Sequence, residues 1–193
     1  MRMQLGNTTI GLVPMSAKPF HQGHFMLIER AATECNEVYV FVSLGDRKRS
    51  GEVPIVGSTM DMIWHRYLEG IMPHNVDVEY VKVPVRAVYE HLGEAEESGS
   101  TSDFAIYGDP TDVEANFPPA RLVKYCPRLI SAKKITNIGV NRTSTFDVSG
   151  TRMREMLAQN NKRGFTAALP DPLSPKARGE IWSALQADIV DQS

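Results

Sequence analysis

Apolar residues occur along this chain in short runs that alternate with segments of helical spacing. The runs are rich in valine, isoleucine and aromatic residues and contain few polar ones, which is typical of strands buried on both faces of a parallel sheet. Such runs predict five strands, at residues 8–15, 37–44, 76–83, 103–107 and 134–140.

Helices are predicted between and after these strands, at residues 25–32, about 58–71, 85–98, 149–160 and, beyond a proline-rich connector at 169–175, at 175–189. Residues 108–112 are predicted to form a turn, and the stretch that follows, which contains Pro118, Pro119 and Pro127, gives no clear pattern. Strands that alternate with helices predict right-handed βαβ units. We therefore expect the α/β class, with a Rossmann-like, doubly wound, parallel five-stranded sheet and a short C-terminal helical extension.

Length and composition narrow the choice of protein class. The 193 residues, 42% hydrophobic and 23% charged, can bury a core, and we expect one domain over residues 1–160 with a connector and helix at 161–193 packing on it. A net charge of −2 does not favour a nucleic-acid partner. Cys35 and Cys126 lack metal or disulfide spacing, so we expect free thiols in a reducing compartment.

Membrane insertion is not expected either. No apolar run approaches the roughly 20 residues that cross a bilayer, and the N-terminus lacks the apolar segment of a signal peptide. The sequence therefore predicts a cytoplasmic protein that does not contact a membrane. It leaves the oligomeric state open, a homo-oligomer included.

Polar clusters follow four of the predicted strands, at residues 16–24, 45–51, 108–112 and 141–154. In α/β folds of this kind, ligands bind beyond the carboxyl ends of the strands. The shared position of these clusters predicts a ligand site made from several loops.

The first cluster contains Pro19-Phe20-His21-Gln22-Gly23-His24, at a predicted strand-to-helix junction. Such a junction presents unpaired N–H groups and the positive end of a helix dipole, which favour phosphate. His21 and His24 add donors, and Gly23 permits close approach to the main chain. The alternative is that both histidines bind zinc, but no third ligand follows at a suitable spacing.

The last cluster contains Asp147-Val148-Ser149-Gly150-Thr151-Arg152-Met153-Arg154. Ser149 suits the N-cap of the helix that follows, and Thr151 offers a hydroxyl. Arg154 lies one turn further on, and its planar guanidinium suits bidentate phosphate binding. The alternative is a capped helix with surface arginines.

Together, the two stretches resemble the HxGH and (I/Y)SGTxxR motifs of the nucleotidyltransferase, or cytidylyltransferase-like, α/β superfamily. The likeness is strongest to the archaeal-type nicotinamide-mononucleotide adenylyltransferases, which carry PFHxGH, a polar loop after the second strand and an Asn-Arg pair before SGT. That pair is matched here by Asn141-Arg142. Ser16 departs from the pattern, because such enzymes usually have arginine there. Either Lys18 supplies that charge or the nucleotide is held differently.

The resemblance implies an enzyme that transfers a nucleotidyl group, most often AMP from ATP, to a phosphorylated small molecule such as nicotinamide mononucleotide and releases pyrophosphate. It implies Mg²⁺ held mainly by the nucleotide phosphates, with no metal site made by the protein alone. The catalytic residues that it implies are His21, His24 and Arg154. The implied nucleotide-binding residues are Lys18, Gly23, Arg47, Gly108, Asp109, Arg142, Ser149, Gly150 and Thr151.

Several alternatives remain open at this stage. The enzyme could instead be a cytidylyltransferase or another adenylyltransferase with a different phosphorylated acceptor, and a non-catalytic nucleotide-binding protein is an alternative of another class. Arg47-Lys48-Arg49 could be a solvated loop, and Asp109 could only shape a turn. Trp64 and Trp182 are expected in the core. Aminoacyl-tRNA synthesis would need anticodon-binding parts that 193 residues do not supply.

Overall fold

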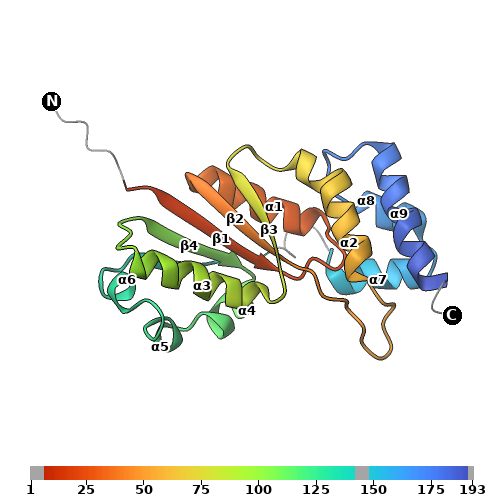
Figure 1. Cartoon of the computed structure of the whole chain (residues 1–193). Coiled ribbons are helices and arrows are strands. Elements are labelled where there is room, and N and C mark those ends of the chain that lie inside the picture. Colours follow the sequence, from red (N-terminus) through yellow and green to blue (C-terminus); the bar gives the residue numbers. More distant parts are fainter. Residues whose placement is uncertain (1–6, 142–147, 191–193) are drawn as a thin grey trace. The chain divides into compact units, whose positions relative to one another are not determined.

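The computed structural model describes residues 7–141 and 148–190. Its strands are β1 (Thr9–Met15), β2 (Glu37–Ser43), β3 (Val76–Val81), β4 (Asp103–Gly108) and β5 (Ile135–Gly139). They form one parallel sheet in the order β3-β2-β1-β4-β5. Figure 1 labels β1, β2, β3 and β4 of this sheet. This order places the first strand in the middle and confirms the predicted Rossmann-like fold class.

The helices are α1 (Gln22–Glu34), α2 (Gly57–Ile63), α3 (Pro84–Glu97), α4 (Pro110–Asn116), α5 (Pro119–Leu122), α6 (Pro127–Ser131), α7 (Gly150–Ala158), α8 (Lys162–Ala167) and α9 (Pro175–Val190). A π-helical turn, Trp64–Leu68, and a 3₁₀ turn, Glu69–Ile71, extend α2. Helix α4 begins within the predicted turn at 108–112, and α5 and α6 lie in the stretch without a clear pattern. Each of the three starts with proline at its first position. Helix α8 was not predicted.

The described chain divides into two compact units. Of the described residues, the sheet unit contains 7–15, Leu27–Val42 and Pro73–Asn141. The helical unit contains Ser16–Met26, Ser43–Met72 and residues 148–190. The helical unit is therefore built from the segments that follow β1, β2 and β5 in the chain, and helix α1 begins in it and ends in the sheet unit.

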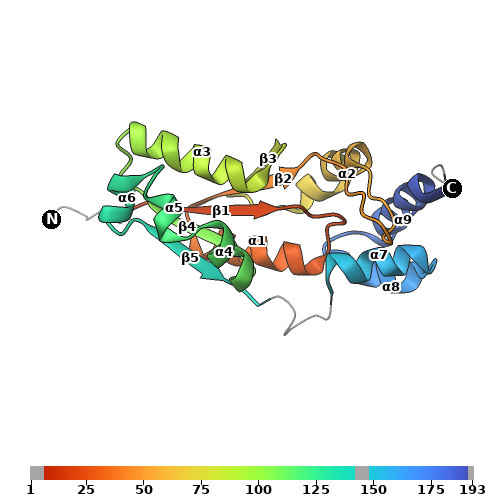
Figure 2. The ribbon, with the colours of Figure 1, turned by 90° about the horizontal axis from the view of Figure 1, so that it is seen from below.

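Helices cover both faces of the sheet, as Figure 2 shows with α3 on one side of β1 and α1 on the other. Leu12, Phe104 and Ile106 belong to the core that the sheet shares with α3 to α6. On the opposite face the Tyr107 hydroxyl donates to Glu34 at the end of α1, at 2.7 Å. Alternation along β4 thus sends Ile106 and Tyr107 to opposite sides, as a doubly wound sheet requires.

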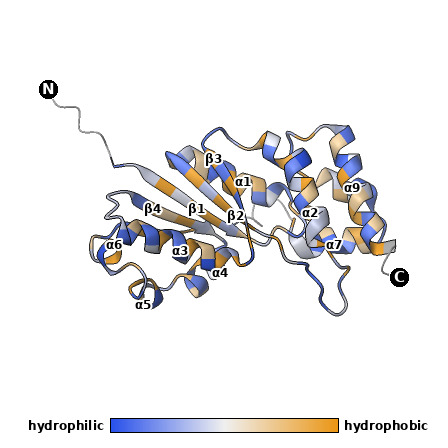
Figure 3. Ribbon diagram, viewed as in Figure 1, coloured by the Kyte–Doolittle hydropathy of each residue, from blue (hydrophilic) through white to orange (hydrophobic). Residues whose placement is uncertain are grey.

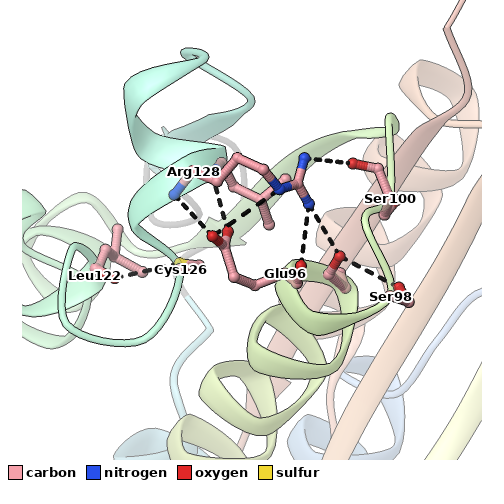
Figure 4. Close-up of polar contacts among 8 residues, drawn as sticks. Glu96, Ser98, Ser100, Leu122, Cys126 and Arg128 are labelled. Atoms are coloured by element: carbon pink, nitrogen blue, oxygen red, sulfur yellow. Dashed lines mark hydrogen bonds and ion pairs between the residues drawn. The ribbon is translucent and has the colours of Figure 1, made fainter.

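Helices α3 and α6 cap one another within the sheet unit (Figure 4). The Glu96 carboxylate accepts the N–H groups of Arg128 (2.8 Å) and Leu129 (3.0 Å) at the start of α6. In return, the Arg128 guanidinium donates to the carbonyls of Ala95 and Ser100 at the end of α3. Both helix ends thereby satisfy main-chain groups that have no partner within the helix.

The helical unit has its own core. Helix α9 packs on α2 and α8 and carries both apolar and polar residues (Figure 3). Trp64 and Trp182 are buried, which confirms that they belong to the core, and Phe165 meets the Trp182 ring edge-on at 5.3 Å. Polar bonds add to this packing, since Tyr67 donates to Glu180 at 2.8 Å.

The two cysteines are free, as expected, and both are buried. Within the described ranges, no helix is long and apolar enough to span a bilayer.

Candidate active site

Two histidines cap the start of helix α1. The N–H of Gly23 donates to Nδ1 of His21 at 3.1 Å, and the N–H of His21 donates to Nδ1 of His24 at 3.3 Å. His21 precedes the helix and His24 is its third residue, so this is the reciprocal pattern of a capping box, with imidazoles in place of hydroxyl and carboxylate. The HxGH spacing therefore has a local structural reason.

This cap also determines where each imidazole carries its proton. A ring nitrogen that accepts an N–H is unprotonated, so in the neutral ring the proton of both His21 and His24 is assigned to Nε2. The two rings are buried, with their centroids 3.8 Å apart. Phe20 stacks on His24 at 5.4 Å and meets Trp64 edge-on at 4.7 Å. The cap thus prepares two neighbouring Nε2–H donors at a helix N-terminus, an arrangement that suits an anion.

The second motif is built around Arg154. Ser149 caps α7, because its Oγ accepts the N–H of Arg152 at 3.2 Å. The guanidinium of Arg154 folds back over the first turn, where Nη2 donates to Thr151 Oγ1 at 3.0 Å. A Cβ on Gly150 would lie only 3.0 Å from Arg154 Nη1, so glycine leaves the room that the guanidinium occupies.

Arg154 also joins the two motifs. Its Nη1 donates to the carbonyl oxygen of Lys18 at 2.9 Å, although the two residues are 136 positions apart. Both motifs belong to the helical unit. Burial lowers the pKa of the Arg154 guanidinium from its ordinary value, and the nearby Arg47 acts in the same direction.

A hairpin after β2 brings a carboxylate to the same arginine. Its two sides are joined by the main-chain bonds between Arg47 and Ile55, at 2.9 and 3.0 Å, and Figure 3 draws its turn mainly in the blue of polar residues. Glu52 near its tip accepts Nε and Nη2 of Arg47 at 2.9 and 3.2 Å. Its carboxylate also lies 3.1 Å from Nε and 3.3 Å from Nη2 of Arg154.

Glu52 was not predicted as a site residue. Hydrogen bonds from Arg47 lower the pKa of its carboxyl most, and the charge of Arg154 adds to that shift. The contact of Arg154 Nε with Glu52 is an ion pair at 3.1 Å without hydrogen-bond alignment. In the sequence, Glu52 is only an acidic residue that follows the basic run 47–49 after a turn at Gly51. This pattern does not reveal that its distant partner is Arg154.

Lys18, in the loop after β1, is buried and its side chain reaches the last residue of β2. Its Nζ donates to the carbonyl oxygen of Ser43 at 2.7 Å. Burial lowers the pKa of its ammonium group, and the negative charge of Asp46 opposes that shift. Asp46 in turn accepts the N–H of Gly57 at 2.7 Å. Lys18 thus places a positive charge next to the first motif and holds the loop after β1 to the loop after β2.

Gln22, the variable residue of the first motif, ties the C-terminal segment to it. Its N–H donates to the carbonyl of Ala168 at 2.9 Å, and its Oε1 accepts the N–H of Asp171 at 2.8 Å. Arg178 holds the same connector by donating to the main-chain oxygens of Thr166, Pro170 and Leu173, at 2.6, 2.9 and 3.1 Å. Sequence reasoning missed both residues, since their partners are main-chain atoms.

Gly108, Asp109 and Arg142 are not among the described residues of the helical unit. Gly108 and Asp109 belong to the sheet unit, where Asp109 caps α4 by accepting the N–H of Thr111 at 3.1 Å. This contact accords with the turn-shaping alternative. Arg142 lies outside the described residues. Residues 7–141 and 148–190 contain no group of three histidines, cysteines or carboxylates that could hold a metal, so the zinc alternative finds no third ligand there.

Comparisons with known proteins agree with this architecture. The family model of the citrate lyase ligase C-terminal domain matches residues 10–63, which include the first motif and the hairpin. A Vibrio parahaemolyticus structure assigned as a nicotinate-nucleotide adenylyltransferase has a TM-score of 0.54 at 13% identity, over 90% of this chain and 98% of that one. No curated protein matches the sequence significantly.

Two structures of a bifunctional NMN adenylyltransferase/ADP ribose pyrophosphatase from Francisella tularensis are similar as well. One has a TM-score of 0.54 at 16% identity and the other, complexed with AMP and a manganese ion, 0.53 at 15%. Each match covers 94% of this chain but only 53% and 52% of the bifunctional chain. Such low identities establish likeness of fold. The chain thus shares the α/β fold of these adenylyltransferase structures.

Proposed function

We propose that this protein is an adenylyltransferase that moves AMP from ATP to the phosphate of a small acceptor such as nicotinamide mononucleotide. The observation that supports it best is the 2.9 Å bond from Arg154 Nη1 to the carbonyl of Lys18, which unites the two motifs in one unit. The similar enzymes, whose printed names include nicotinate-nucleotide and NMN adenylyltransferases, support the choice of substrate.

In the proposed reaction, an oxygen of the acceptor's phosphate attacks the α-phosphorus of ATP. The bond from that phosphorus to the oxygen bridging to the β-phosphate breaks, and pyrophosphate leaves with the electron pair. The Nε2–H groups of His21 and His24 donate to phosphate oxygens as negative charge develops. The protein supplies no nucleophile, because positioning and charge stabilisation suffice for this class of reaction.

The start of α7 is the proposed cradle for the β- and γ-phosphates. Ser149, Gly150 and Thr151 form the N-terminal end of a nine-residue helix, where main-chain N–H groups point toward a ligand, and Arg154 contributes its guanidinium. Arg47 is close enough to share an anion with Arg154, since both already hold the carboxylate of Glu52. The roles of Lys18, Gly23, Gly108, Asp109 and Arg142 in binding the nucleotide stay predictions.

A divalent cation, proposed to be Mg²⁺, would neutralise phosphate charge in this site. Asp46, a carboxylate of the cluster, already accepts the N–H of Gly57 and pairs with Lys48. The donor set therefore suits a cation that is held mainly by phosphate oxygens and water, as Mg²⁺ commonly is. The manganese ion of the similar Francisella tularensis complex supports a divalent ion here.

Release of pyrophosphate tests this proposal. The protein is incubated with ATP or CTP, each with and without nicotinamide mononucleotide, and products are identified by mass. Release with ATP and the mononucleotide, with NAD as product, is the expected result. Release with CTP or with another acceptor would keep the chemistry and replace the substrate. Nucleotide binding without release of pyrophosphate, across a broad panel of phosphorylated acceptors, would favour a non-catalytic binding protein.

A cytoplasmic location is also part of the proposal, and the two free thiols support it.

A further inference from the structure

Glu52 occupies the binding edge of both arginines in the candidate site. Its Oε2 lies 2.9 Å from Arg47 Nε and 3.1 Å from Arg154 Nε, and its Oε1 lies 3.2 and 3.3 Å from the two Nη2 atoms. Arg47 donates to the carboxylate through its Nε–Nη2 edge, whereas Arg154 donates through Nη2, with its Nε close by but not aligned as a hydrogen bond. Phosphate uses this same edge when it binds arginine through two atoms.

The other edges of Arg154 are engaged too. Nη1 donates to the Lys18 carbonyl and Nη2 also donates to Thr151 Oγ1. A phosphate that binds this guanidinium side-on must therefore take the position of the Glu52 carboxylate. The two anions are competitors for one site.

The exposure of the partners indicates which one yields. The Arg154 side chain is 5% exposed, whereas that of Glu52 is 27% exposed and is carried by the hairpin turn. The base of the hairpin is fixed, because Ile55 is buried and the Asp46 carboxylate accepts the Gly57 N–H. Arg154 is thus held in place, whereas the Glu52 carboxylate can move into solvent.

Charge favours the same exchange. With Glu52 in place, two guanidinium groups face one negative charge, and a pyrophosphate or triphosphate carries several. We propose, on the basis of the proposed function, that Glu52 is a substitute anion that binds Arg47 and Arg154 until a polyphosphate displaces it. The carboxylate then returns when pyrophosphate leaves, which sets both the affinity for the nucleotide and the release of the product.

The opposing interpretation gives Glu52 a permanent role. A carboxylate that only orients the two arginines would stay bound beside the phosphate, and its removal would weaken binding. The two interpretations therefore predict opposite effects of the same substitution. If Glu52 competes, the apparent Kd for a polyphosphate is the intrinsic Kd divided by the fraction of molecules in which Glu52 has left the arginines.

Binding of inorganic pyrophosphate, measured by titration calorimetry, tests the proposal. Glu52→Gln keeps the size of the side chain and removes its charge, and we expect its Kd for pyrophosphate to fall about five-fold, because a neutral amide is a weaker competitor for guanidinium. Glu155→Gln is the matched control, since it removes one exposed negative charge next to Arg154 in the sequence. Its Kd should stay that of the unmodified chain. Glu52→Ala, checked for folding by circular dichroism, should tighten binding in the same way.

The outcomes separate this proposal from the proposed function. Pyrophosphate binding that is unchanged or weaker in both Glu52 variants would overturn the competition and leave the adenylyltransferase proposal intact. Pyrophosphate binding that is detected in the Glu52 variants but not in the unmodified chain would support the competition, because Glu52 would then exclude pyrophosphate almost completely. Absence of pyrophosphate and ATP binding in every variant would contradict both proposals, because the phosphate site itself would then be wrong.

Discussion

His24 has two separable tasks, and two substitutions distinguish them. Its Nδ1 accepts the N–H of His21 at 3.3 Å, and its Nε2 carries the proton that we assign to the reacting phosphates. The Oδ1 of asparagine can take the place of Nδ1, and the amide nitrogen of glutamine can take the place of Nε2. His24→Asn therefore keeps the cap and removes the donor, whereas His24→Gln keeps a donor and removes the cap.

The sizes of the two effects follow from the contacts. Loss of the cap leaves a buried N–H on His21 without its acceptor, which costs about 1–2 kcal/mol of unfolding free energy. Loss of a donor to the transition state lowers turnover by about 10²–10³-fold. His24→Ala would lose both groups, so it is the less informative variant.

Urea unfolding and steady-state release of pyrophosphate measure the two quantities. His24→Asn should unfold within about 0.5 kcal/mol of the unmodified protein while turnover falls by about 10²–10³-fold. His24→Gln should lose about 1–2 kcal/mol of stability while its turnover falls less. Full turnover in His24→Asn would refute the assignment of Nε2 as the donor, and unchanged stability in His24→Gln would refute the cap.

Three further predictions address other parts of the chain. Arg154→Ala should weaken ATP binding by at least about ten-fold in equilibrium titrations, because a bidentate charged contact is lost, and an unaltered affinity would count against the cradle. Gly57→Ala should lower the unfolding free energy by about 1–3 kcal/mol, since a Cβ there would clash with a main-chain oxygen. Gly70→Ala is its control, because a Cβ there meets nothing within 4 Å, and equal stability of the two variants would disprove the clash. Burial raises the pKa of Cys126 to about 11 and raises that of Cys35, so neither thiol should react with a disulfide reagent at about pH 8 until urea unfolds the protein. Rapid labelling of the folded chain would contradict their burial.

The strands and the two motifs could be predicted because their signals are local. The run from Val38 to Val42 is β-branched and aromatic throughout, and it forms strand β2, between β3 and β1 in the sheet. Ser149 sits directly before a run of helix formers and caps α7. Cap residues and continuous apolar runs depend on neighbours within a few positions, so one sequence is enough to find them.

The partners of the site could not be predicted in the same way. Glu52 pairs with Arg154 across 102 positions, and Gln22 binds a connector 149 positions away. Helix α8 was missed because it is six residues long and follows α7 after a short turn, where Asn161 caps it. Short helices and distant side-chain pairs depend on packing of the whole chain, which periodicity does not reveal. The expected boundary at residue 160 stays a prediction.

The destination of the α-phosphate tests the central claim most directly. ATP labelled at its α-phosphorus is incubated with Mg²⁺ and nicotinamide mononucleotide, and the products are separated and identified by mass. The account predicts that the label appears in a dinucleotide and that the pyrophosphate released is unlabelled. Label that remains in ATP, or that appears only in free AMP with every phosphorylated acceptor tried, would contradict nucleotidyl transfer by this protein.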